Sequence, residues 1–108
     1  MSYDIDLMID TGGDELATIC DVGNMTSNVS PMWAKALGFY LSELNTKNAG
    51  ESIPILEKAV LHMRENEAEY LPLNPSNGWG DYGGALRYLQ NLLDACKRHP
   101  KAIIYISH

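Results

Sequence analysis

Cysteine is scarce in this chain, with only two among its 108 residues. Cys20 and Cys96 are far apart in the sequence, and each lies in an apolar, periodic stretch. This placement favours two reduced, buried thiols over a disulfide scaffold, while a single bridge between them stays open. With 45% apolar content, residues 1–108 are expected to fold as one globular domain.

Long apolar runs are missing as well. No stretch approaches the ~20 apolar residues that cross a bilayer. The N-terminus lacks the basic and apolar regions of a secretion signal. We therefore expect a soluble, cytoplasmic protein with no membrane partner.

Basic residues are absent from the first 34 positions, which hold six acidic side chains. The rest of the chain contains eight acidic and eight basic residues, so the net charge of −6 belongs to this N-terminal third. Such a surface repels phosphate backbones, and nucleic acid is not an expected partner. A solvated sheet face explains these acids most simply; a hard-cation site at Asp4, Asp6 and Asp21, or a surface for a basic partner, stays open.

Catalytic and metal-binding patterns are also lacking. None of the three histidines has the spacing of a metal ligand, and no cofactor is indicated. Asp10-Thr11-Gly12 matches the signature of aspartic proteases, but that fold is almost wholly β, and a hairpin turn explains the same residues. No catalytic residue is assigned; an enzyme would have to use Asp81 or an N-terminal aspartate, with Arg87 as an anion clamp.

The N-terminal residues alternate in the manner of a half-buried strand. Between residues 3 and 10, isoleucine and leucine occupy one face and three aspartates the other. A second apolar run over residues 16–22 follows Gly12 and Gly13. The two runs predict an antiparallel hairpin.

Three helices are predicted next. Ser30 as N-cap and Pro31 in the first turn begin a short helix that ends at Gly38. A second helix opens at residues 52–54, and a third, with a continuous apolar stripe, follows Asp81 and ends at residue 98.

Residues 102–107 form an almost unbroken apolar run, which predicts a final strand that is central or covered on both faces. The predicted order is β-β-α-α-α-β. Folding this strand beside the N-terminal hairpin gives a two-layer α+β domain, in which an antiparallel sheet packs against three helices.

Two segments, residues 24–33 and 74–84, look suited to binding. Each is rich in Asn, Ser or Thr, contains a tryptophan and runs into a helix start, where free backbone N–H groups favour an anionic or carbonyl ligand. The tryptophans offer stacking surface, and two adjacent glycines at a helix start imply close approach of a ligand or of backbone. The candidate ligand-binding residues are Asn24, Asn28, Trp33, Asn74, Asn77, Trp79, Tyr82, Gly83, Gly84 and Arg87.

A structural role competes with this interpretation. Asn-Pro, Ser-Asn-Gly and Gly-Trp-Gly are also what a long rigid loop needs, with tryptophan filling the core. An Asp81 carboxylate that caps its own helix would compete with a bound anion.

The motif Asn74-Pro75-Ser76-Asn77-Gly78-Trp79-Gly80-Asp81-Tyr82, together with residues 28–33, resembles a family of small proteins found in bacteriophage and bacterial genomes. The resemblance implies a shared fold over most of residues 20–107 and a viral or mobile-element setting, hence a host cytoplasm. It implies no mechanism.

The leading hypothesis is a non-catalytic binder of a small polar ligand, nucleotide-like in the simplest case, that sequesters or modulates a host factor. The alternative is a protein-interaction module that contacts a host or phage partner through the aromatic segments or the acidic hairpin. Self-association stays open.

Overall fold

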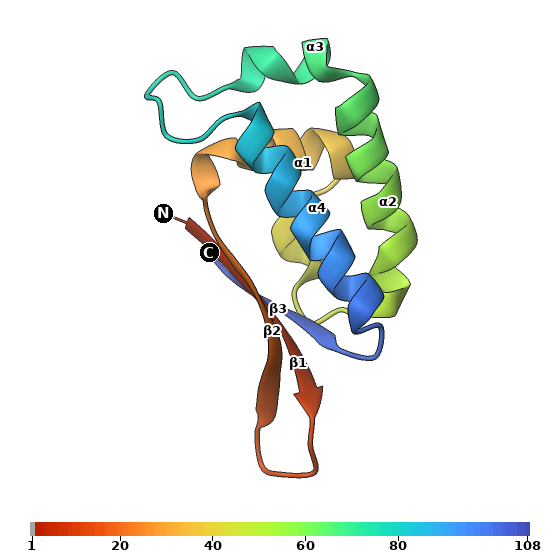
Figure 1. Ribbon diagram of the computed structural model, residues 1–108. Coiled ribbons are helices and arrows are strands. Elements are labelled where there is room, and N and C mark those ends of the chain that lie inside the picture. The colour runs from red at the N-terminus through yellow and green to blue at the C-terminus, as the bar shows by residue number, and fades with distance from the viewer. Residues whose placement is uncertain (1) are drawn as a thin grey trace.

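The computed structural model describes residues 2–108 and shows an α+β domain, as the sequence predicts. Its antiparallel sheet has the order β2-β1-β3, formed by β1 (Ser2–Asp10), β2 (Leu16–Thr26) and β3 (Ile103–Ser107). The helices cover one side of the sheet, and the β1–β2 hairpin projects beyond them (Figure 1).

The helical part contains four α-helices instead of the three expected. They are α1 (Ser30–Leu37), α2 (Ala49–Glu65), α3 (Glu67–Tyr70) and α4 (Tyr82–Arg98), and the full order is ββααααβ. The 3-10 segments η1 (Ser27–Val29), η2 (Leu41–Leu44) and η3 (Leu71–Leu73) lie between them. The extra helix is the single turn α3. Asn66 separates it from α2, and the Asn66 side-chain Nδ2 donates to the His62 carbonyl.

The start of α2 was predicted too late. Asn48 is the N-cap, because its side chain accepts a hydrogen bond from Glu51 N at 2.9 Å. Ser52 therefore lies inside the helix, buried, with its hydroxyl donating to the Asn48 carbonyl. Pro54 also lies inside α2 and does not open it.

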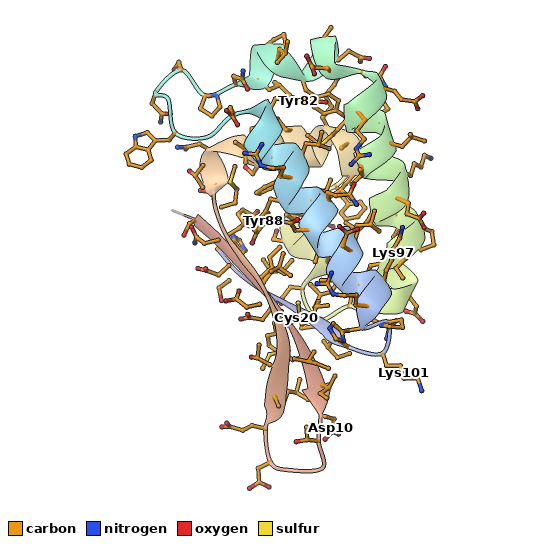
Figure 2. All side chains as sticks on the ribbon, viewed as in Figure 1. Asp10, Cys20, Tyr82, Tyr88, Lys97 and Lys101 are labelled. Carbon is orange, nitrogen blue, oxygen red and sulfur yellow. The ribbon has the colours of Figure 1, made fainter. Side chains whose placement is uncertain are left out.

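The core lies between the sheet and the helices. The sheet contributes Ile5, Leu7 and Ile104, all fully buried, while aspartates on the same strand face outward, so the predicted alternation is confirmed. Helix α4 packs across α2 and the sheet. Its Tyr88 points toward the sheet in Figure 2, where the hydroxyl donates to the Gly23 carbonyl at 2.8 Å.

The final strand is an edge strand, so its prediction as a central or doubly covered strand was wrong. Only alternate residues are buried, and Tyr105 faces solvent. The outer edge of β3 is nonetheless paired, because the Thr46 and Lys47 backbone exchanges hydrogen bonds with Ile104. Residues 45–48 thus protect this edge in place of another strand.

Both cysteines are free thiols, so no Cys20–Cys96 bridge is present. Burial raises the pKa of Cys96 to about 11. None of the helices within residues 2–108 has the length and apolar character that a membrane span requires.

Candidate functional site

A polar groove lies where the two predicted binding segments meet. Strand β2 continues to Thr26, four residues past its expected end, and this extension carries Asn24 to the solvent-facing side of the sheet. The loop before α4 reaches the same place. The groove has a volume of about 420 Å³ and is lined by Ser2, Asn24, Thr26, Asn28, Asn77 and Trp79.

Local hydrogen bonds fix which polar atoms the groove presents. The Asn24 Nδ2 amide donates to Ser2 Oγ at 3.0 Å and to Asp4 Oδ1 at 3.1 Å, so its Oδ1 is left as an acceptor. The Asn77 Oδ1 accepts from Trp79 N at 2.9 Å, so its Nδ2 is left as a donor. One acceptor and one donor therefore come from two segments that are distant in sequence.

Trp79 is the aromatic surface of the groove. Its side chain is 68% exposed, in keeping with the stacking platform that the sequence suggested. Trp79 lies in a loop that Asn74 helps to close, because the Asn74 Oδ1 accepts from Tyr82 N at 2.9 Å. Asn74 is thus a structural residue of the loop and does not line the groove.

Trp33 and Tyr82 are core residues, which corrects the expectation that they contact a ligand. Trp33 is fully buried, and its Nε1 donates to the Ala85 carbonyl at 3.0 Å. The Tyr82 hydroxyl donates to the Met63 carbonyl, and burial, followed by the Glu67 charge, raises its pKa. Both polar atoms are already satisfied inside the protein.

The glycines of this region serve close packing within the protein. A methyl group at Gly84 would lie 2.7 Å from Met25 Cε, so a side chain, Met25, occupies the space that the sequence predicts for a ligand or for backbone. Gly83 faces the Arg87 guanidinium, and neither of these two residues lines the groove. Gly80 is more tightly constrained: with φ at 91°, its added Cβ would lie 2.7 Å from Thr26 Cγ2 and 2.8 Å from Val29 Cγ1.

The helix starts do not form the anion site that the sequence suggested. The Asp81 Oδ1 accepts from Gly84 N at 2.8 Å, which confirms Asp81 as the cap of α4 and places a carboxylate where an anion would bind. At α1 the N-cap is Val29, one residue earlier than expected, and Ser30 is the first helical residue. The start of α4 therefore disfavours a bound anion.

The outer face of the sheet beside the groove is acidic. Asp6 and Asp21 are paired directly across β1 and β2. Partial burial raises the pKa of Asp6, and the charges of Asp21 and Asp4 raise it further. Within residues 2–108, no group of three His, Cys, Asp or Glu side chains is placed to hold a metal ion.

Sequence reasoning missed two lining residues, Ser2 and Thr26. Their positions depend on the register, which pairs Ser2 with Thr26 and Asp4 with Asn24 at the end of the hairpin. If the second strand is continued through residues 23–26, the alternation of side chains places Ser2 and Thr26 on the same face of the sheet as Asn24.

Searches of protein-family models, curated proteins and solved structures find no match for this chain.

Proposed function

We propose that this protein is a non-catalytic binder of a small, uncharged, planar polar ligand of the nucleoside type. The observation that carries this proposal is the groove of about 420 Å³, in which Asn24, Asn77 and the exposed Trp79 come together. None of the six lining side chains is acidic or basic, which supports a role in binding without catalysis.

Hydrogen-bond complementarity supports the nucleoside class. The Asn24 acceptor and the Asn77 donor match the paired donor and acceptor on the edge of a nucleobase, and asparagine reads such edges in known complexes. The Trp79 ring offers a stacking surface for any base. The Asp4 carboxylate, which accepts from the lining residue Asn24, disfavours a phosphate, so a nucleoside fits better than its nucleotide.

The test is a titration with the four ribonucleosides and with their 5′-monophosphates, followed by calorimetry. A nucleoside should bind at least as tightly as its monophosphate. Because base stacking is worth roughly 1–3 kcal/mol, Trp79→Ala should lower the affinity about tenfold or more. Tyr40→Ala is the matched control, since Tyr40 is 69% exposed and lies outside the groove.

Equal loss of affinity in Trp79→Ala and Tyr40→Ala would overturn the proposed site. Much tighter binding of the monophosphate would overturn the preference for an uncharged ligand. Because the sequence resembles small phage proteins, we propose that the role of this binding is to sequester a host metabolite.

A protein-interaction role is the second candidate, favoured by the projecting hairpin (Figure 1). Strand β3 pairs with β1 only from Asp4 to Met8, so the hairpin tip extends beyond the third strand. Exposed acids at Asp10, Asp14 and Glu15 suit a basic partner. Salt-sensitive binding of a lysine-rich peptide, lost on replacing these three acids by their amides, would support this role; no loss in that variant would exclude it.

A further inference from the structure

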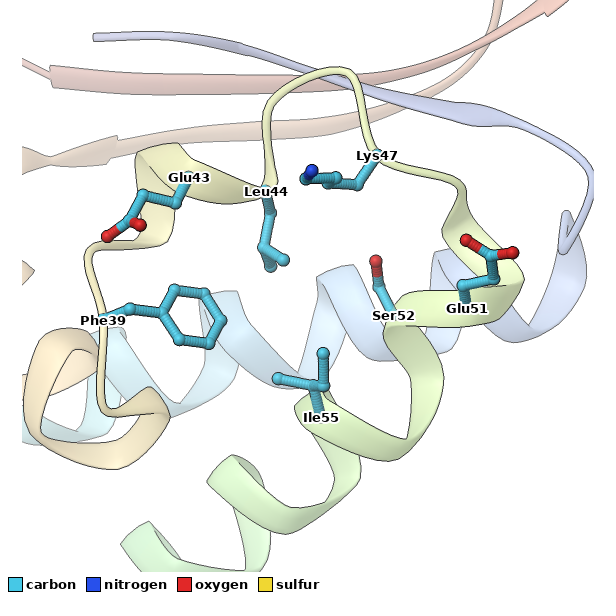
Figure 3. Close-up of a pocket in the computed structure, with 7 residues that line it drawn as sticks. All are labelled: Phe39, Glu43, Leu44, Lys47, Glu51, Ser52 and Ile55. Atoms are coloured by element: carbon cyan, nitrogen blue, oxygen red, sulfur yellow. The ribbon is translucent and has the colours of Figure 1, made fainter.

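A second pocket shares no residue with the groove. It has a volume of about 380 Å³ and lies between the α1–η2 connection and the first turns of α2. Phe39, Leu44 and Ile55 form its apolar surface, as Figure 3 shows. The volume is within the range of pockets that hold small organic molecules.

Lys47 is the cation of this pocket. Its ammonium group extends over the apolar side chains, whereas Glu43 and Glu51 lie at the two rims with carboxylates turned away from the centre (Figure 3). The Glu43 Oε2 already accepts from Tyr40 N at 2.9 Å. The two ion pairs found within residues 2–108 are Lys35–Glu69 and Lys97–Glu57, so no carboxylate of the described chain pairs with Lys47.

The backbone beneath Lys47 is held firmly. Thr46 N donates to the Ile104 carbonyl at 2.7 Å, and Ile104 N donates to the Lys47 carbonyl at 2.9 Å. Thr46 has φ at 69°, the only positive value among the described residues other than glycine. A β-branched residue tolerates this conformation only where surrounding bonds impose it, so the fold fixes where the Lys47 side chain begins.

We propose that this pocket binds a small apolar carboxylate, with the carboxylate on Lys47 and the apolar chain against Phe39, Leu44 and Ile55. An unpaired ammonium above an apolar surface is complementary to a ligand with one negative end and one apolar end. An apolar ammonium lacks this complementarity because its charge would face Lys47.

The test uses octanoate and octylammonium, two eight-carbon probes with head groups of opposite charge. Amide chemical shifts followed by NMR should move at residues 39–55 with octanoate, and octanoate should bind more tightly than octylammonium. Lys47→Met keeps an unbranched side chain only one atom shorter and removes its charge, so it should weaken octanoate binding about tenfold.

Lys101→Met is the matched control, because Lys101 projects from the α4–β3 connection and does not line the pocket (Figure 2). Its octanoate affinity should stay at the wild-type value. Ile55→Glu, at a position 40% exposed on α2, provides a second variant that should retain the fold and lose octanoate binding. Unchanged affinity in Lys47→Met, equal binding of octylammonium, or shifts confined to other residues would each overturn the proposal.

Discussion

Gly80 is the residue at which the loop before α4 meets the sheet. Gly80→Ala combines a backbone cost, since φ is 91°, with contacts to Thr26 and Val29 that are shorter than 3.0 Å. A positive φ costs a side chain roughly 1–2 kcal/mol and overpacking about 1–3 kcal/mol more. We therefore expect Gly80→Ala to lower the free energy of unfolding by about 2–5 kcal/mol, measured by urea denaturation.

Gly78 is the matched control for this prediction. It also has a positive φ, 78°, but an added methyl group would meet nothing within 4 Å. Gly78→Ala should therefore lower the free energy of unfolding by only about 1–2 kcal/mol, the backbone cost alone. Equal effects of the two substitutions would show that packing at Gly80 does not hold the loop.

At the scale of single residues, the sequence identified the two segments that meet but not the role of each side chain. Trp33 and Trp79 occur in similar polar contexts, yet one is fully buried and the other is 68% exposed. The difference arises because Trp33 lies one helical turn into α1, on the side that faces Ala85. Such placement depends on tertiary contacts, which local composition does not encode.

At the scale of elements, the β1–β2 pairing sets Asp6 against Asp21. Because burial and these neighbouring charges raise the pKa of Asp6, its ionisation destabilises the fold. The free energy of unfolding is therefore higher at low pH, where Asp6 is protonated, and falls as the pH rises through the raised pKa of Asp6. Asp6→Asn should therefore raise the melting temperature at pH 7, an effect worth a few tenths to about 1 kcal/mol.

The same substitution should have no effect near pH 3, where the carboxyl is protonated in both the folded and the unfolded chain. Asp10→Asn is the control, because Asp10 lies at the end of β1 and is paired with Leu16. A melting temperature that is equally raised at both pH values would contradict the charge explanation.

Periodicity predicted the hairpin, α4 and the final strand, since each carries a long, regular apolar pattern. It failed where a short polar contact decides the boundary, as with the Asn48 cap that begins α2. It also failed for β3, because an apolar run does not distinguish a central strand from an edge strand protected by a loop.

At the scale of the molecule, we expect the backbone amides of the final strand to be better protected from hydrogen exchange than those of the hairpin tip. The Ile104 amide donates to the Lys47 carbonyl, and the Ile106 amide donates to Asn45 Oδ1 at 2.8 Å. Amide exchange should therefore be slow at both residues and fast at residues 11–15 of the projecting tip. Asn45→Ala should accelerate exchange at Ile106 and leave Ile104 protected; rapid exchange throughout β3 in the wild type would contradict the arrangement.

The two tryptophans also give the molecule two separate optical reporters. The indole of Trp33 is surrounded by the core and bonded to the Ala85 carbonyl, so its emission should stay at short wavelength until the domain unfolds. Trp79 is largely in water and should emit at long wavelength in the folded state. A single fluorescence spectrum can therefore distinguish occupation of the groove, which changes the long-wavelength component, from loss of the fold, which changes the short-wavelength one.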